Sequence, residues 1–121
     1  MTAEKLLREL AATIDSHRWG DLPGLLHEEF TCTLVHTGEV FDRDTWVSFN
    51  ASYPGFQDFT IEESVGSGDH AAGRGHVTGY DAAGVLQHFG VATFITVRDG
   101  LIHSATEVWC DVDEEPPPGT R

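Results

Sequence analysis

Two segments in the second half of the chain alternate their residue types with a period of two, as β-strands do. They are residues 74–80 and 105–109. Successive side chains of a strand point to opposite faces, so one face of each segment collects ionisable and aromatic side chains. These are Arg74, His76, Thr78 and Tyr80 in the first segment, and Glu107 and Trp109, beside Ala105, in the second. Such stripes are typical of the wall of a ligand pocket, so the pattern predicts a pocket lined by both strands.

The first quarter of the chain has the apolar spacing of helices. Apolar residues recur with helical period between residues 6 and 14, and Thr2 can cap this first helix. A second, short helix is predicted from Asp21 to about His27, with Pro23 in its first turn.

A third helix and a series of strands follow. Asp42 caps a helix that places Trp46, Phe49 and Tyr53 on one face and ends at Pro54. Alternating or apolar runs predict strands over residues 30–36, 59–65, 70–80, 85–97 and 101–112, with a tight Arg98-Asp99-Gly100 hairpin between the last two. Three helices followed by long hairpins predict an α+β domain, with helices on one face of a curved antiparallel sheet.

Length and composition limit the classes of protein that fit. A chain of 121 residues has the length of one domain, which we assign to residues 1–112, and the acidic, proline-rich residues 113–121 are predicted to be disordered. The net charge of −13 disfavours nucleic acids and anionic membranes as partners. The sequence has neither a signal-peptide pattern nor an apolar run that would span a bilayer, so we expect a cytoplasmic protein. Cys32 and Cys110 lack the spacing of metal ligands and are expected to be buried free thiols.

Two stretches resemble a known family. Residues 19–30, with the Gly20-Asp21-Leu22 step, and residues 94–102, with the Asp99-Gly100 turn, are similar to the nuclear transport factor 2-like superfamily. This superfamily includes SnoaL-like polyketide cyclases, ketosteroid isomerases and limonene-epoxide hydrolases. The resemblance covers about residues 5 to 112. It implies a cone-shaped, cystatin-like fold with three N-terminal helices, a pocket between sheet and helices, and dimers formed through the outer sheet face.

The resemblance also limits the chemistry. It places Ala12, Leu34 and Thr93 where ketosteroid isomerases carry their catalytic tyrosine and two aspartates, so steroid isomerisation by that mechanism is not expected. It places Arg74 and Glu107 on the pocket side, a partial match to the aspartate–arginine–aspartate relay of the epoxide hydrolases.

The candidate catalytic residues are Glu107, Arg74 and His76. Glu107 would act as a general base, Arg74 would orient its carboxylate, and His76 would relay or donate a second proton. The alternative is a structural Arg74–Glu107 ion pair. No metal site is expected, because His36, His76 and Glu107 lack metal-ligand spacing and Arg74 would repel a cation; no cofactor is expected either.

The remaining predictions concern ligand and partner. The candidate substrate-binding residues are His36, Trp46, Phe49, Tyr53, Tyr80, Thr93 and Trp109. They suit a small apolar or aromatic molecule. The first function considered is an isomerase, cyclase, dehydratase or hydrolase; the alternatives are a non-catalytic ligand-binding protein and a dimeric association module. A homodimer is predicted through an outer face formed by Leu86, Ala92, Phe94, Ile102 and Val108.

Overall fold

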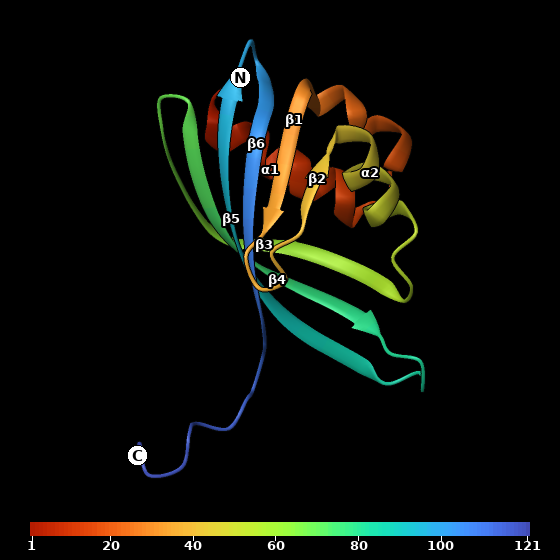
Figure 1. Ribbon diagram of the computed structural model, residues 1–121, viewed down its shortest axis with the longest axis vertical. Coiled ribbons are helices and arrows are strands. Elements are labelled where there is room, and N and C mark those ends of the chain that lie inside the picture. Colours follow the sequence, from red (N-terminus) through yellow and green to blue (C-terminus); the bar gives the residue numbers. More distant parts are fainter.

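The computed structural model describes residues 1–121 as a six-stranded sheet that curves around two α-helices (Figure 1). The helices are α1 (Ala3–Asp15) and α2 (Arg43–Ala51), and two short 3₁₀ turns, η1 (Trp19–Asp21) and η2 (Pro23–Leu25), follow α1. The strands are β1 (Leu26–Leu34), β2 (Val40–Asp42), β3 (Phe56–Ser67), β4 (His70–Tyr80), β5 (Leu86–Arg98) and β6 (Leu101–Asp111), in the sheet order β2-β1-β6-β5-β4-β3. The predicted α+β fold is therefore confirmed.

Local side-chain bonds fix where both helices begin. The Thr2 hydroxyl accepts a hydrogen bond from the Lys5 backbone N–H at 3.2 Å and caps α1. Asp42 caps α2 in a reciprocal capping box: its carboxylate accepts from the Thr45 backbone N–H at 2.9 Å, and the Thr45 hydroxyl accepts from the Asp42 backbone N–H at 3.0 Å. The backbone N–H and the hydroxyl group of Thr45 both donate to the Asp42 carboxylate, which lowers the pKa of this group.

The predicted second helix is wrong, because the segment does not form an α-helix. The segment forms the two 3₁₀ turns η1 and η2, and β1 already begins at Leu26. Pro23 cannot donate a backbone hydrogen bond, and Leu22 is fully buried against the core, so packing and the missing donor end the helical geometry after single turns. Strand β2 was not expected, because its three residues are too few to give a period.

The sheet is mixed and not purely antiparallel as predicted. The hairpins β3–β4, β4–β5 and β5–β6 are antiparallel, but β1 pairs with β6 in parallel. The predicted Asp99-Gly100 hairpin is present, with positive φ values of 55° and 75° that match a type I′ turn. The parallel pair brings Leu34 of β1 opposite Glu107 of β6, two residues far apart in the sequence.

The core fills the space between α1 and the concave face of the sheet. Leu7 and its apolar helix neighbours are buried there, and β4 gives them room through glycine: a Cβ at Gly73 would lie 2.9 Å from Leu7 Cδ2. Ile102 is fully buried in this core, so its predicted place on the outer face is wrong; the irregular register between Thr96 and Val97 turns it inward.

The C-terminal end of the chain lies apart from this core. Residues 113–121 form no helix or strand; Glu114 still borders the space inside the sheet, and the chain then extends away from the sheet in Figure 1. Neither helix is long and apolar enough to cross a membrane.

Candidate functional site

A cavity of about 560 Å³ lies between the concave face of the sheet and the helices. This volume is within the range of small-molecule sites. Sixteen of its 24 lining residues are hydrophobic, and all three tryptophans of the chain contribute to its wall. The aromatic lining consists of Trp19, Trp46, Phe49, Tyr53, Phe56, Phe59, Phe89 and Trp109.

Glu107 is the buried ionisable group of this cavity. It lies in the middle of β6, with Leu34 opposite it on β1 and Thr93 opposite it on β5. Residues directly opposite one another on neighbouring strands face the same side, so all three side chains point to the concave face. Glu107 is only 7% exposed, and Thr93 and Leu34 are buried as well.

Three uncharged donors hold the Glu107 carboxylate. Trp46 Nε1 and Cys32 Sγ donate to Oε2 at 3.2 and 3.1 Å, and Trp109 Nε1 donates to Oε1 at 3.0 Å. A carboxylate has about four lone-pair sites, so one site, on Oε1, has no partner within the protein. Oε1 can therefore accept from a ligand, or carry a proton and donate it.

The donors come from three different elements, which fixes the position of the carboxylate. Trp46 projects from α2 and packs against Phe30, with ring centroids 5.2 Å apart. The Asn50 side chain, one turn later, donates to the Trp46 backbone carbonyl at 2.9 Å. Cys32 comes from β1 and Trp109 from β6, two residues after Glu107.

Burial dominates the electrostatics of the site. It raises the pKa of Glu107, while the bonds from Cys32, Trp109 and Trp46, and the charge of His36, oppose the rise. Burial and the adjacent Glu107 carboxylate raise the pKa of Cys32 above its ordinary range. Cys32 is therefore a neutral thiol that donates its S–H to Glu107.

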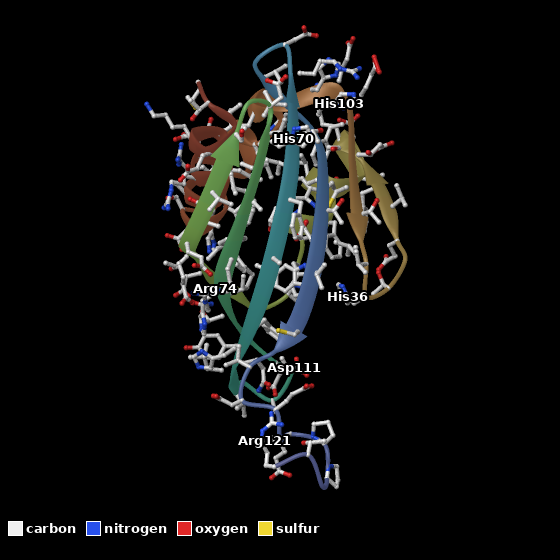
Figure 2. All side chains as sticks on the ribbon, turned by 90° about the vertical axis from the view of Figure 1, so that its left-hand side faces the viewer. His36, His70, Arg74, His103, Asp111 and Arg121 are labelled. Carbon is white, nitrogen blue, oxygen red and sulfur yellow. The ribbon has the colours of Figure 1, made fainter.

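Most of the predicted pocket residues line the cavity with Glu107. They are His36, Trp46, Phe49, Tyr53, Thr93 and Trp109. Phe49 packs between Phe41 and Tyr53, with ring centroids 4.9 and 5.5 Å away. His36 is exposed just beyond the end of β1, and Figure 2 shows it on the opposite side of the sheet from Arg74.

Arg74 does not share this cavity, so its predicted pairing with Glu107 is wrong. Gly73 is the residue of β4 aligned with Thr93 and Glu107, whereas Arg74 is aligned with Ala92 on the outer, convex face. Arg74 is exposed there, and it bonds Glu63 at 3.0 Å and Glu62 at 3.1 Å, which raises its pKa. The predicted alternation within the strand is correct, but the predicted face, which rests on residue type and on the family resemblance, is the wrong one: Gly73, and not Arg74, faces α1.

His76 and Tyr80 are also outside the cavity wall, contrary to prediction. His76 Nε2 lies 2.9 Å from His88 Nδ1 on the convex face, and its Nδ1 lies 3.7 Å from Glu62. Tyr80 is exposed at the end of β4. Thr78, from the same stripe, bonds Asp58 and borders the cavity near its edge.

Three contributors were not expected from the sequence. Cys32 was read as a simple buried thiol, Asp111 was not singled out, and Glu114 was placed in the tail, yet all three lie at the site. Asp111 continues the alternation of Glu107 and Trp109 along β6, so extending that stripe by one step would have found it. No signal in the sequence indicated Glu114. The structure contains no group of three or more His, Cys, Asp or Glu side chains arranged to hold a metal ion.

The sequence and the fold of this chain are similar to those of known proteins. The family model of the SnoaL-like domain matches residues 7–105. A candidate ketosteroid isomerase from Kribbella flavida is 28% identical, with a TM-score of 0.82 over 95% of this chain and 82% of that chain. A hypothetical protein from Catenulispora acidiphila with a ketosteroid isomerase-like fold, in complex with trimethylamine, is 18% identical (TM-score 0.74; 84% and 82% covered).

An LEH-like epoxide hydrolase from M. tuberculosis is 10% identical, with a TM-score of 0.77 over 89% of this chain and 82% of that chain. No curated protein matches the sequence. Because the family model spans most of the chain, the protein belongs to the SnoaL-like domain family and has the nuclear transport factor 2-like fold.

Proposed function

We propose that the protein binds a small, mainly apolar molecule in the cavity and that Glu107 exchanges a proton with it. The observation that carries the proposal is the Glu107 carboxyl group, buried in an aromatic wall with one lone-pair site unoccupied. The reaction class is that of an isomerase, cyclase, dehydratase or hydrolase. The occurrence of a candidate isomerase and an epoxide hydrolase among proteins of this fold supports an enzymatic role.

The three donors suit both protonation states of Glu107. They occupy the same three sites whether Oε1 carries a proton or a free lone pair, so proton transfer requires no rearrangement of Trp46, Cys32 or Trp109. The raised pKa brings the group closer to neutral pH, where a general base is strong and its acid form is still accessible. Glu107 would thus take a proton from an activated carbon or a water and return it later in the cycle.

The aromatic side chains would bind the apolar frame of the molecule. In this proposal Trp46, Phe49, Tyr53 and Trp109 contact the ligand, and His36 and Thr93 supply polar contacts. This assignment retains six of the residues predicted from the sequence and leaves out Tyr80.

Hydrogen–deuterium exchange into 2-tetralone tests the proposal without knowledge of the natural substrate. In deuterium oxide the Glu107 carboxylate would remove a proton from C1 of this bicyclic ketone, leaving the enolate. The resulting carboxylic acid would exchange this proton for a solvent deuteron and deliver the deuteron to C1. We expect the protein to accelerate exchange above buffer, and Glu107→Gln to lose about 10²–10⁴-fold of that acceleration. Exchange by Glu107→Gln at the parent rate would overturn the proposal.

A non-catalytic ligand-binding protein is the second candidate. The observation that favours it is the position of Arg74 and His76 on the convex face, which leaves Glu107 as the buried acid–base group of the cavity. Tryptophan fluorescence reports binding in the same experiment, because all three tryptophans line the cavity. Quenching by 2-tetralone without accelerated exchange would favour this candidate.

We further propose that two copies associate through the convex face of the sheet. Leu86, Phe94 and Val108 are exposed there, and Ala92 lies between Arg74 and Val108 in the register. Burying these side chains is the gain that would favour association. Sedimentation should show a dimer at high micromolar concentration, and a monomer alone at that concentration would contradict this proposal.

A further inference from the structure

Apart from His36, the ionisable side chains that carry charge around the cavity are all acidic. None of its 24 lining residues is lysine or arginine, whereas Glu107, Asp111 and Glu114 are acidic. His36, at the end of β1, is the one lining residue that becomes cationic on protonation. The chain as a whole carries 20 acidic residues against 7 lysines and arginines. A field of this sign attracts cations to the cavity and repels anions.

The Glu107 carboxylate also has no cationic partner among its bonded neighbours. All three donors are neutral side chains, and Arg74, the cation expected beside it, lies on the opposite face. A buried ionised carboxylate is costly unless a positive charge accompanies it. The unoccupied site on Oε1 is where such a charge would donate a hydrogen bond or make contact.

The surrounding rings add a second attraction for a cation. Trp46 and Trp109 both reach Glu107 through their indole N–H groups, so their rings lie beside the carboxylate in the cavity wall. Aromatic faces attract ammonium groups, tryptophan most strongly, and the attraction grows when water is excluded. A carboxylate among aromatic rings therefore favours a positively charged nitrogen with apolar substituents.

We infer that the ligand of this cavity is an apolar amine, with its cationic nitrogen against Glu107 and its hydrocarbon frame against the aromatic wall. The inference rests on the proposed function, because it names the class of molecule that the same site takes. A cation at this position keeps Glu107 ionised, which is the form that accepts a proton.

A pair of probes with the same shape and different charge tests the inference. The cationic probe is (1-naphthylmethyl)trimethylammonium, and the neutral probe is 1-neopentylnaphthalene, in which carbon replaces the nitrogen. Affinities are measured by calorimetry, and the indole N–H NMR signals of Trp46 and Trp109 report whether each probe occupies the cavity. A quaternary nitrogen carries no proton, so its binding is independent of proton transfer to Glu107.

We expect the cationic probe to bind at least about tenfold more tightly than the neutral probe. Glu107→Gln should abolish or reverse this preference, whereas Glu63→Gln, which removes the same charge from the convex face, should leave it unchanged. If Glu107→Gln does not fold, the ratio of affinities in the parent protein decides alone.

The two proposals fail in different ways. Equal or tighter binding of the neutral probe would overturn the amine inference and leave small-molecule binding in the cavity intact. A preference that persists in folded Glu107→Gln would also overturn it, since the net charge and not the carboxylate would then select the cation. If neither probe perturbs the tryptophan signals, both the inference and the proposed binding function are wrong.

Discussion

On the convex face of the sheet, Arg74 bonds Glu62 and Glu63 in contact with solvent, and His76 pairs with His88 beside them. On the concave face, two strands away and one position along the register, Glu107 is buried and its carboxylate bonds neutral donors alone. Solvent and salt screen the first group of charges, while the second lies where a charge is costly. The convex face carries more ionisable groups, but we expect the chemistry on the concave face, because burial raises the pKa of the Glu107 carboxyl group.

The largest contrast between the faces should appear in proton transfer. In the 2-tetralone assay we expect Glu107→Gln to lose about 10²–10⁴-fold of the acceleration, while Arg74→Gln and His76→Gln stay within about twofold of the parent. The physical reason is that the latter two side chains contact neither the cavity nor Glu107. A loss of similar size in either convex-face variant would show that side chains of the convex face contribute to proton transfer in the cavity.

Removal of one donor from Glu107 should have the next largest effect. Trp46→Phe keeps an aromatic ring against Phe30 but leaves Oε2 with Cys32 as its one donor. We expect a loss of about 1–3 kcal/mol in the free energy of unfolding, measured by urea denaturation. The Glu107 pKa should rise further, because this bond opposes the effect of burial. Unchanged stability and an unchanged pKa would show that the indole bond is not formed in solution.

Alanine substitutions of one glycine on each face allow a matched comparison of stability, with a smaller expected effect. A Cβ at Gly73 would meet Leu7 Cδ2 at 2.9 Å inside the core, whereas a Cβ at Gly90 would meet the sulfur of the exposed Cys110 at 3.1 Å. Gly73→Ala should cost about 1 kcal/mol or more through overpacking, and Gly90→Ala should be neutral or slightly stabilising. Equal effects on the urea midpoint would contradict the packing difference between the faces.

Arg74→Gln should have the smallest effect on stability. The ion pairs that it breaks are exposed, so we expect the urea midpoint to change little and the remaining difference to disappear at high salt. A loss that persists at high salt would show that Arg74 contributes through packing of its hydrocarbon chain.

The elements of the fold follow from local signals that the sequence carries. Helix caps at Thr2 and Asp42, the Asp99-Gly100 turn and long alternating strands are short-range features, and the structure contains all of them. The parallel pairing of β1 with β6 depends on contacts across about 75 residues of sequence, which no local pattern encodes. The 3₁₀ turns were missed because Leu22 is placed by the core and not by helix propensity.

The candidate site was predicted in part for the same reason. Periodicity places Glu107 and Trp109 on one face of β6 and gives α2 its aromatic face, and these residues do line the cavity. The choice of face rests on residue type, which predicts that the ionisable stripe points inward; this is correct for Glu107 on β6 and wrong for Arg74 and His76 on β4. Gly73 is the residue of β4 that makes room for Leu7 of α1, a steric constraint visible only once the helix is in place. Cys32 was missed as a donor because its partner is 75 positions away.

The raised pKa of Glu107 has a defined consequence for stability. Its folded pKa exceeds its unfolded pKa, so the native state binds more protons between the two values. The contribution of the protonated group is fully present below the unfolded pKa and is lost as pH rises through the folded one. The parent protein should therefore lose stability relative to Glu107→Gln as pH rises across this window.

The most direct test of the account is a ¹³C NMR titration of the Glu107 side-chain carboxyl carbon, assigned by comparison with Glu107→Gln. We predict a midpoint above the ordinary glutamate value of 4.5, together with shifts of the Trp46 and Trp109 indole N–H signals at the same pH. A midpoint at or below the ordinary value, or indole signals that do not follow it, would contradict the claim that burial prepares this carboxyl group for proton exchange.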